Sequence, residues 1–306
     1  MKILITGALG HIGSSLSRRL ANYQKVKKIY LIDNLISQRY CSLYSLPNSN
    51  KFEFRDLDIA KCKIKDIPNS NLVIHLAAKT DAAQSSKFKK EFNTNNLNAT
   101  KNIIKYCSKY SSKLIFASST SVYGPQDKTV DEDCKKSDLN PQSPYAKIKL
   151  FEEKIISKQL KKENYIILRL GTIYGFSPGI RFHTAVNKFC FQASINQPLT
   201  IWKTAYNQKR PYLSLDDFND LIIHILNNKV SFNEIYNAVS KNMTVKQIVD
   251  IIKKFKKVNL TYVNHPIMNQ MSYEVKNNKL IKNNFKFKSK VIPDIKRTLD
   301  KLKNVY

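Results

Sequence analysis

The segment Lys2-Ile-Leu-Ile-Thr-Gly-Ala-Leu-Gly-His-Ile-Gly13, at the start of the chain, decides the fold. It begins with a short apolar run that is typical of a buried strand, and the run ends in a glycine-rich turn. Residues 11–23 then place apolar side chains at the spacing of one helix face. The unpaired N–H groups at the start of a helix attract phosphate, and glycine lets the backbone approach it closely. The segment therefore predicts a phosphate-binding loop between a strand and a helix.

The glycines of this loop, Gly7, Gly10 and Gly13, stand out because glycine is scarce elsewhere. The chain has seven glycines in 306 residues, whereas a usage of roughly 7% would give about twenty. Such a chain should keep glycine mainly where a side chain cannot be tolerated. The spacing is G-x-x-G-x-x-G, which differs from the G-x-G-x-x-G of the standard dinucleotide fingerprint. We favour a bound dinucleotide over an ordinary glycine turn without a ligand.

An acidic residue, Asp33, lies twenty residues after Gly13 and directly follows a second strand-like run at 29–32. A carboxylate at this place can accept hydrogen bonds from the adenosine ribose hydroxyls, and it repels a 2′-phosphate. The alternative is an aspartate that only starts a turn. The position favours NAD over NADP as the cofactor.

Strand and helix patterns alternate through the first half of the chain. Strand-like runs at 29–32, 52–54, 72–75, 114–117 and 166–168 are separated by helical patterns that include 97–110 and 145–163. This alternation predicts an α/β fold, a Rossmann doubly wound parallel sheet with helices on both faces. Beyond Gly179 the pattern changes to helices at 182–195, 216–227 and 244–256 with short strand-like pieces, such as 235–237. We expect an NAD-binding Rossmann domain at 1–174. Residues 175–306 should form mostly a smaller mixed α/β substrate-binding domain, with some segments returning to the first.

The charge of the chain is strongly basic, at +29, but the kind of basic residue argues against a nucleic-acid partner. Only eight of the 52 basic residues are arginine, and the lysines spread along the whole length. Base recognition and bidentate phosphate binding favour arginine. A non-catalytic or RNA-binding member of the fold remains a less favoured alternative.

The cysteines, the histidines and the apolar stretches indicate the cellular compartment of the protein and whether it has a metal site or a membrane segment. The five cysteines have no metal-ligand spacing and the five histidines form no cluster, so we expect no metal site. No apolar stretch is long enough to cross a membrane, and the N-terminus has no signal-like pattern. We expect a cytoplasmic protein without a membrane partner.

A phenol and an ammonium, Tyr145 and Lys149, lie four residues apart on one face of the predicted helix 145–163. A tyrosine that acts as a base at pH 7 needs its pKa lowered by about three units from its usual value near 10. A neighbouring lysine and a nicotinamide cation could supply this. The hydroxyl-rich stretch 117–124 follows a predicted strand, so its side chains face the crevice at the carboxyl end of the sheet. Together these features outweigh the interpretation of Tyr145 and Lys149 as a surface pair.

With these segments, the chain resembles an extended short-chain dehydrogenase/reductase of the NAD-dependent sugar-nucleotide epimerase/dehydratase family. The resemblance rests on 6–13, 33–35, 56–57, 75–78, Asn96, 118–124, 141–145 with Lys149, 168–175, 181–182, 186–187, 210–212 and Asp217. It implies a nucleotide-diphosphate sugar as the substrate and polysaccharide biosynthesis as the setting. It also implies a homodimer built on the helices at 97–110 and 145–163.

The resemblance also implies roles for individual residues. Tyr145 would be the general acid and base, Lys149 would lower its pKa and hold the nicotinamide ribose, and Ser119 would bind the reacting hydroxyl. The implied cofactor residues are Gly7, Gly10, His11, Ile12, Gly13, Asp33, Asn34, Asp56, Leu57, Leu76, Ala77, Ala78, Asn96, Tyr145 and Lys149. The implied substrate residues are Thr80, Ser119, Thr172, Arg181, Asn187 and Arg210, although Arg181 could equally be a surface arginine at the start of a helix.

Departures from the family pattern narrow the reaction. Dehydratases of the family usually place an Asp–Glu pair after the catalytic threonine, and here those positions are Thr120 and Ser121. We therefore expect a 4-epimerase that works through a transient 4-keto sugar with bound NAD. An NAD(P)-dependent 4-dehydrogenase or ketoreductase, or a dehydratase, remains the alternative. Thr172 stands where many relatives have Asn, and Arg55 stands where a Gly usually precedes Asp56.

Overall fold

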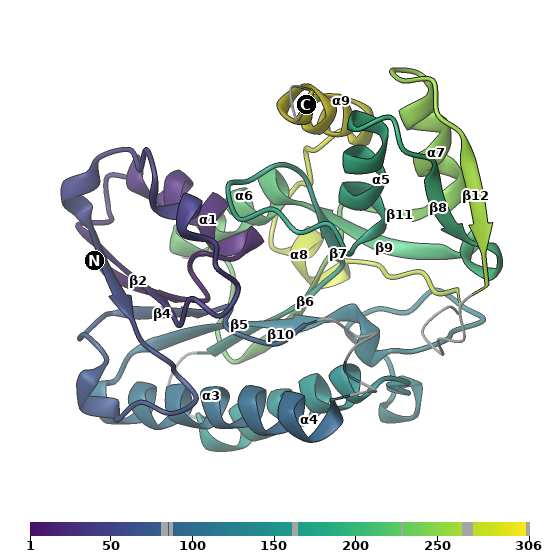
Figure 1. Ribbon diagram of the computed structural model, residues 1–306. Coiled ribbons are helices and arrows are strands. Elements are labelled where there is room, and N and C mark those ends of the chain that lie inside the picture. Colours follow the sequence, from purple (N-terminus) through teal and green to yellow (C-terminus); the bar gives the residue numbers. More distant parts are fainter. Residues whose placement is uncertain (81–84, 86–87, 161–164, 228, 265–271, 304–306) are drawn as a thin grey trace.

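The centre of the molecule is a seven-stranded parallel sheet with the strand order β10-β6-β5-β4-β1-β2-β3 (Figure 1). The computed structural model describes residues 1–80, 85, 88–160, 165–227, 229–264 and 272–303. The strands are β1 (Lys2–Thr6), β2 (Lys28–Asp33), β3 (Phe52–Asp56), β4 (Leu72–His75), β5 (Lys113–Ser119), β6 (Tyr165–Leu170) and β10 (Glu234–Ala238). The order reverses between β1 and β4, and a crevice opens at such a point in doubly wound sheets. The predicted Rossmann fold class is confirmed.

Helices cover both faces of this sheet, because its strands carry apolar side chains on both sides. In β1, Ile3 and Ile5 pack in one buried cluster with α1 (His11–Ala21), α6 (Leu215–Leu226) and α8 (Asn278–Lys282). Leu4 between them packs in the opposite cluster with α3 (Lys89–Tyr110) and α4 (Pro144–Gln159), which lie side by side below the sheet in Figure 1. This alternation follows from the two-residue period of a strand. No helix of the described segments is both long and apolar enough to cross a membrane.

The predicted helix at 97–110 begins eight residues early, at Lys89. Asparagine and threonine dominate that first part, and their weak helix propensity hides the pattern. Contacts of the buried residues Phe92 and Asn96 with Lys79 hold this part of the helix. The predicted helix at 145–163 ends at Gln159 as α4, and residues 161–164 lie outside the described part.

A smaller lobe lies beside the carboxyl ends of the sheet (Figure 1). Its sheets pair β7 (Thr172–Tyr174) and β11 (Lys241–Thr244) with β9 (Lys209–Ser214), and β8 (Leu199–Trp202) with β12 (Leu260–Val263). Its core holds α5 (Ala185–Ser194), α7 (Val245–Lys253) and α9 (Val291–Leu302). Short 3-10 turns lie at Tyr40–Leu43, Ser49–Lys51, Ile64–Asp66, Thr120–Val122, Lys136–Asp138 and Lys203–Ala205. Three segments beyond residue 175, β10, α6 and α8, pack with the central sheet.

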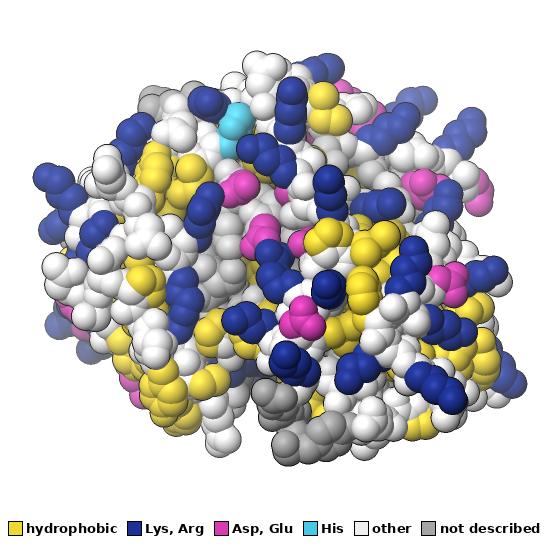
Figure 2. Space-filling view, turned by 90° about the horizontal axis from the view of Figure 1, so that it is seen from above, with side chains coloured by type: hydrophobic (Ala, Val, Ile, Leu, Met, Phe, Trp, Pro, Cys, Tyr) yellow, Lys and Arg dark blue, Asp and Glu magenta, His cyan; other side chains and the backbone are white. Residues whose placement is uncertain are grey.

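The basic side chains are dispersed over the face of the molecule that Figure 2 shows. On the face in Figure 2, Lys and Arg side chains are scattered across both lobes, with Asp and Glu side chains among them. A scattered arrangement keeps a strongly charged protein in solution without making one continuous anion-binding track.

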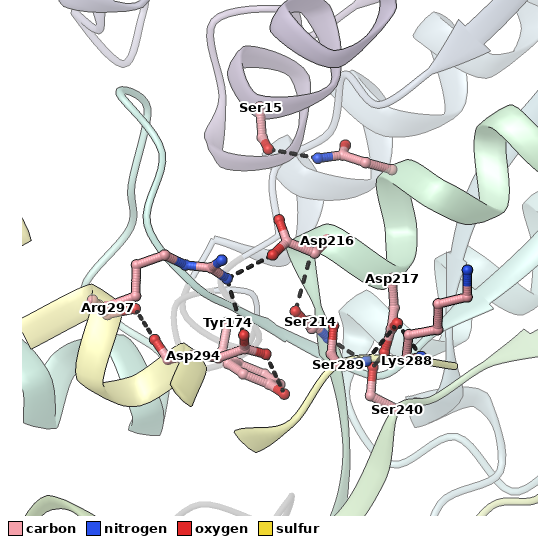
Figure 3. Close-up of polar contacts among 12 residues, drawn as sticks. Ser15, Tyr174, Ser214, Asp216, Asp217, Ser240, Lys288, Ser289, Asp294 and Arg297 are labelled. Carbon is pink, nitrogen blue, oxygen red and sulfur yellow. Dashed lines mark hydrogen bonds and ion pairs between the residues drawn. The ribbon is translucent and has the colours of Figure 1, made fainter. Parts of the chain in front are cut away.

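A buried carboxylate, Asp217 on α6, fixes the segment that leads into α9 (Figure 3). Its Oδ1 accepts hydrogen bonds from the backbone N–H groups of Lys288 and Ser289 at 2.8 and 3.0 Å. Its Oδ2 accepts a hydrogen bond from the Ser240 hydroxyl at 2.5 Å. The Asp217 side chain therefore connects α6, which covers the central sheet, to the residues that precede β11 and α9 in the smaller lobe.

Replacing Asp217 by Ala should lower the free energy of unfolding by about 3 kcal/mol, because buried N–H donors lose a charged acceptor. Chemical denaturation measures this. Asp220→Ala is the matched control on the same helix, since Asp220 forms an exposed ion pair with Arg19 (38% and 55% exposed). That change should cost less than about 1 kcal/mol. Equal losses in the two variants would contradict the anchoring role of Asp217.

Candidate functional site

A cavity of about 850 Å³ lies at the carboxyl ends of the central strands and collects most of the predicted site residues. The predicted residues that line it are Gly7, Gly10, His11, Ile12, Gly13, Asp33, Asn34, Leu57, Leu76, Ala77, Ala78, Thr80, Ser119, Tyr145, Lys149, Thr172, Arg181 and Arg210. They come from both lobes and from segments up to two hundred residues apart. The cavity is large enough for a small-molecule ligand of substantial size.

Three predicted residues do not line the cavity. Asp56 ends β3 with an exposed side chain, and the next residues, Leu57 and Asp58, turn to the cavity instead. Asn96 is fully buried and its amide holds both the N–H and the carbonyl of Lys79, at 2.8 and 2.9 Å. Asn187 is also fully buried, and its amide binds backbone groups of Gly175 and Arg181. These two asparagines fix cavity walls, because burial in backbone contacts leaves them no open face.

The glycines of the first loop are required for different physical reasons. A Cβ at Gly7 would lie 2.7 Å from the backbone nitrogen of Ala77, and the φ of Gly7 is +66°. A Cβ at Gly13 would lie 2.6 Å from the carbonyl oxygens of Gly7 and Ala8. At Gly10 an added Cβ would meet only the Gly7 carbonyl oxygen, at 3.2 Å, and the φ is −67°.

Gly10 is the glycine of this loop that packing within the protein constrains least, because its added Cβ meets a single carbonyl oxygen. It precedes α1 directly and lines the cavity. No side chain caps that helix, and Gly10 has an extended backbone. A helix N-terminus that has no side-chain cap and is preceded by a glycine fits the pyrophosphate of a dinucleotide. Gly179 belongs to the same packing, since a Cβ there would lie 2.3 Å from the Leu9 carbonyl oxygen.

Asp33 closes the loop from the end of β2. Its Oδ2 accepts a hydrogen bond from the N–H of Leu9 at 3.1 Å, and its Oδ1 accepts one from the N–H of Leu35 at 3.1 Å. Burial raises the pKa of Asp33, while these N–H groups and Arg39 oppose the rise. Each carboxylate oxygen keeps a lone pair that can accept a bond from a ribose hydroxyl. The position fits an adenosine ribose.

His11, the residue after Gly10, is neutral and structural in character. Its Nε2 lies 2.8 Å from the Gly175 carbonyl oxygen, so it donates there. Burial lowers its pKa to about 4. With the bond from the Ser177 hydroxyl to the His11 carbonyl oxygen, at 2.9 Å, it ties the loop to the start of the smaller lobe.

Tyr145, Lys149 and Ser119 meet on one wall of the cavity. Ser143 caps α4 by accepting a bond from the Ala146 N–H at 3.1 Å, and Pro144 begins the helix, so Tyr145 lies in its first turn. Burial raises the pKa of Tyr145, and the Lys149 ammonium and a hydrogen bond with Ser119 oppose that rise. The net direction is upward, so these side chains alone do not give the lowered pKa that the sequence predicts. The positive nicotinamide ring of a bound cofactor would act in the required direction.

The opposite wall carries cations from the smaller lobe. Arg181 donates to the Thr80 hydroxyl and to His183 Nε2, the latter at 2.9 Å. Arg210 lies over the Tyr273 ring, 5.3 Å from its centroid. Planar guanidinium groups suit the paired oxygens of a diphosphate.

Sequence reasoning missed several residues of the cavity wall. Trp202, Tyr273, His183 and Asp58 line it together with Arg39. Arg39 could have been sought six residues after Asp33, whereas Trp202 and Tyr273 come from the smaller lobe and carry no pattern that points to the site. Among the residues with described positions, no cluster of three or more His, Cys, Asp or Glu is arranged to hold a metal ion.

The chain is similar in sequence to proteins from other organisms. The chain is 31% identical over 275 residues to a dTDP-D-glucose 4,6-dehydratase of Dictyostelium discoideum, covering 82% of this chain and 62% of that protein. It is 28% identical over 265 residues to an uncharacterized UDP-glucose epimerase of Bacillus subtilis, covering 83% of this chain and 81% of that one.

Among solved structures, a UDP-glucuronic acid 4-epimerase from Bacillus cereus, in complex with UDP-glucuronic acid and NAD, superimposes with a TM-score of 0.90. The two chains are 25% identical, and each is covered completely. The family model of the NAD dependent epimerase/dehydratase family matches residues 3–238. That match spans the phosphate loop, the Tyr145–Lys149 helix and β10, and this protein belongs to the NAD-dependent epimerase/dehydratase family.

Proposed function

We propose that this protein is an NAD-dependent nucleotide-sugar 4-epimerase. The observation that carries the proposal is the composition of the wall around Tyr145. The two residues that follow Ser119 are hydroxyls: Thr120 bonds to the Leu170 carbonyl oxygen at 3.3 Å, and Ser121 to Ser119 at 2.8 Å. The described carboxylates of the cavity wall are Asp33, which ends β2, Asp58, which follows β3, and Glu91, which pairs with Lys79. Among the described wall residues, the two positions after Ser119 therefore lack the carboxylic acid and base that eliminate water in dehydratases of the family, whereas epimerisation needs neither.

Tyr145 takes the proton from the C4 hydroxyl of the sugar, and the Ser119 hydroxyl holds that oxygen in place. The phosphate loop and Asp33 would hold NAD, which would supply the hydride acceptor and hydride donor for C4. Lys149 stabilises the Tyr145 phenolate through its charge. After the 4-keto sugar has turned over, Tyr145 gives the proton back to the C4 oxygen, so neither protons nor electrons are consumed.

The substrate is a nucleotide-diphosphate sugar held between the two lobes. Arg181 and Arg210 bind the diphosphate, and residues 175–306 supply most of the substrate-binding domain. Thr172 and Ser121 place hydroxyls on the wall near Ser119. The structural relative bound to UDP-glucuronic acid makes UDP-uronic acids and UDP-hexoses the first substrates to test.

The decisive test uses a panel of UDP-, GDP-, CDP- and dTDP-sugars without added cofactor. Purified protein should convert one of them to its C4 epimer with unchanged mass and without accumulation of NADH, because the hydride is returned. Nuclear magnetic resonance of the sugar follows the configuration. NADH formed in step with product would indicate a dehydrogenase, and loss of one water would indicate a dehydratase.

We also propose an oligomeric state and a cellular setting for this protein. A homodimer would form through the outer faces of α3 and α4, where Phe151 is 46% exposed. We place the protein in the cytoplasm, in polysaccharide biosynthesis, without nucleic acid or membrane as a partner. Light scattering that gives the monomer mass would contradict the dimer.

A further inference from the structure

Two adjacent glutamates on α4 are buried, and each pairs with a different cation. Glu152 and Glu153 are 1% and 2% exposed. Glu153 binds Arg169 at 2.7 Å and accepts a bond from the Ser118 hydroxyl at 2.5 Å. Glu152 instead places its Oε2 3.2 Å from Nζ of Lys149. The sequence did not predict that a carboxylate would pair with Lys149.

The position of Glu152 is fixed by the neighbouring helix. The Thr100 hydroxyl, on α3, donates to its Oε1 at 2.6 Å. The Lys149 ammonium also lies 4.4 Å from the ring centroid of Phe116, on β5. The ammonium therefore has an ion-pair partner in Glu152 and a cation–π contact with Phe116.

Glu152 ends a chain of hydrogen bonds that begins beside the phosphate loop. The Ala77 N–H donates to the Thr6 hydroxyl at 3.2 Å, and that hydroxyl lies 2.6 Å from Nδ1 of His75. Nε2 of His75 lies 3.4 Å from the Thr100 hydroxyl. Since the Thr100 proton goes to Glu152, His75 must donate from Nε2 and accept at Nδ1. Each bond of the chain then points its proton toward the carboxylate.

We propose that Glu152 is a positioning residue that holds the Lys149 ammonium in place and offsets part of its field at Tyr145. This inference rests on the proposed function of the same site. Lys149 and Glu152 are neighbours of Tyr145 on α4, and their opposite charges partly cancel there. Without Glu152, its carboxylate no longer competes with the phenolate for the Lys149 ammonium, so the phenolate is favoured.

The other groups around the pair do not replace this charge. Arg181, from the smaller lobe, adds a positive charge near Tyr145 and favours the phenolate, and Ser119 contributes a hydrogen bond. His75, on β4, is neutral because burial and the Lys149 charge lower its pKa to about 3. Glu152 itself acts on the pKa of Tyr145 in the raising direction.

The variant Glu152→Gln tests the proposal, because it keeps the size and an acceptor oxygen for Thr100 while removing the charge. The ultraviolet band of the Tyr145 phenolate is isolated by subtracting the spectrum of the same protein with Tyr145→Phe. The titration midpoint of Tyr145 should fall by about one pH unit relative to wild type. An unchanged or higher midpoint overturns the proposal.

Glu153→Gln is the matched control on the same helix. It breaks the pair with Arg169, so the thermal midpoint should fall while the Tyr145 titration stays in place. Equal shifts of that titration in both variants would show a general packing effect and overturn the proposal. The titration needs no substrate, so it decides the role of Glu152 even if no nucleotide sugar is converted. In an active enzyme, the acid limb of the kcat/KM profile should move down with the phenolate.

Discussion

The variant Tyr145→Phe should lose about a thousandfold in kcat. The phenol supplies the proton acceptor and the proton donor of the same cycle, and general acid–base catalysis typically contributes about 10² to 10⁴-fold, so about 10³ is the middle of that range. The ring stays in the first turn of α4, against the same wall of the cavity. NAD binding, measured by calorimetry, should therefore remain close to that of wild type.

Tyr123→Phe is the control for this experiment. Tyr123 is another buried phenol, and its hydroxyl bonds to Arg169 and Asn237 at 3.0 and 2.9 Å, away from the residues that line the cavity. Its loss should lower stability by about 1 to 2 kcal/mol and leave kcat within a few-fold. Near-normal turnover in Tyr145→Phe would disprove the assignment of the base.

The second large effect separates two glycines of the same loop. In Gly13→Ala, the new Cβ would lie 2.6 Å from two carbonyl oxygens, so the loop must move even without a ligand. This variant should unfold at a clearly lower temperature in the cofactor-free state, by an amount equivalent to about 2 kcal/mol or more. In Gly10→Ala the one close contact is 3.2 Å to a carbonyl oxygen and the backbone angle is ordinary, so the free protein should keep its stability to within about 1 kcal/mol.

NAD should distinguish the two variants from wild type in thermal denaturation. A ligand that binds only the native state raises the midpoint by an amount that depends on its concentration relative to Kd. The rise on adding NAD should be nearly lost in Gly10→Ala, because its methyl group occupies the surface on which the pyrophosphate rests. A full rise in Gly10→Ala would mean that the loop does not cradle phosphate.

The reach of the sequence can be judged from these same residues. The sequence placed Tyr145 and Lys149 on one helix face by their spacing and the hydroxyl-rich stretch 117–124 at a strand end, whereas the choice of Ser119 within that stretch came from the family resemblance; all three line the cavity. Asp33 followed from its place after a strand. Asp56 and Asn187 matched family positions, yet the structure turns the first to solvent and buries the second in backbone contacts. The direction of a side chain at a strand end, and the partners of a buried amide, depend on neighbours that sequence spacing does not specify.

The sequence by itself determined the Rossmann fold class, the phosphate loop and the Tyr145–Lys149 pair, because short-range patterns of apolar residues and glycines encode each of them. Only the tertiary structure showed that packing within the protein constrains Gly10 less than Gly7 and Gly13, whose added Cβ atoms would lie within 3 Å of other backbone atoms. It also brought Glu152 to Lys149 and carried Arg210 and Tyr273 to the shared cavity. These relations join residues far apart in the chain, so they arise from packing between layers, which local sequence pattern does not contain.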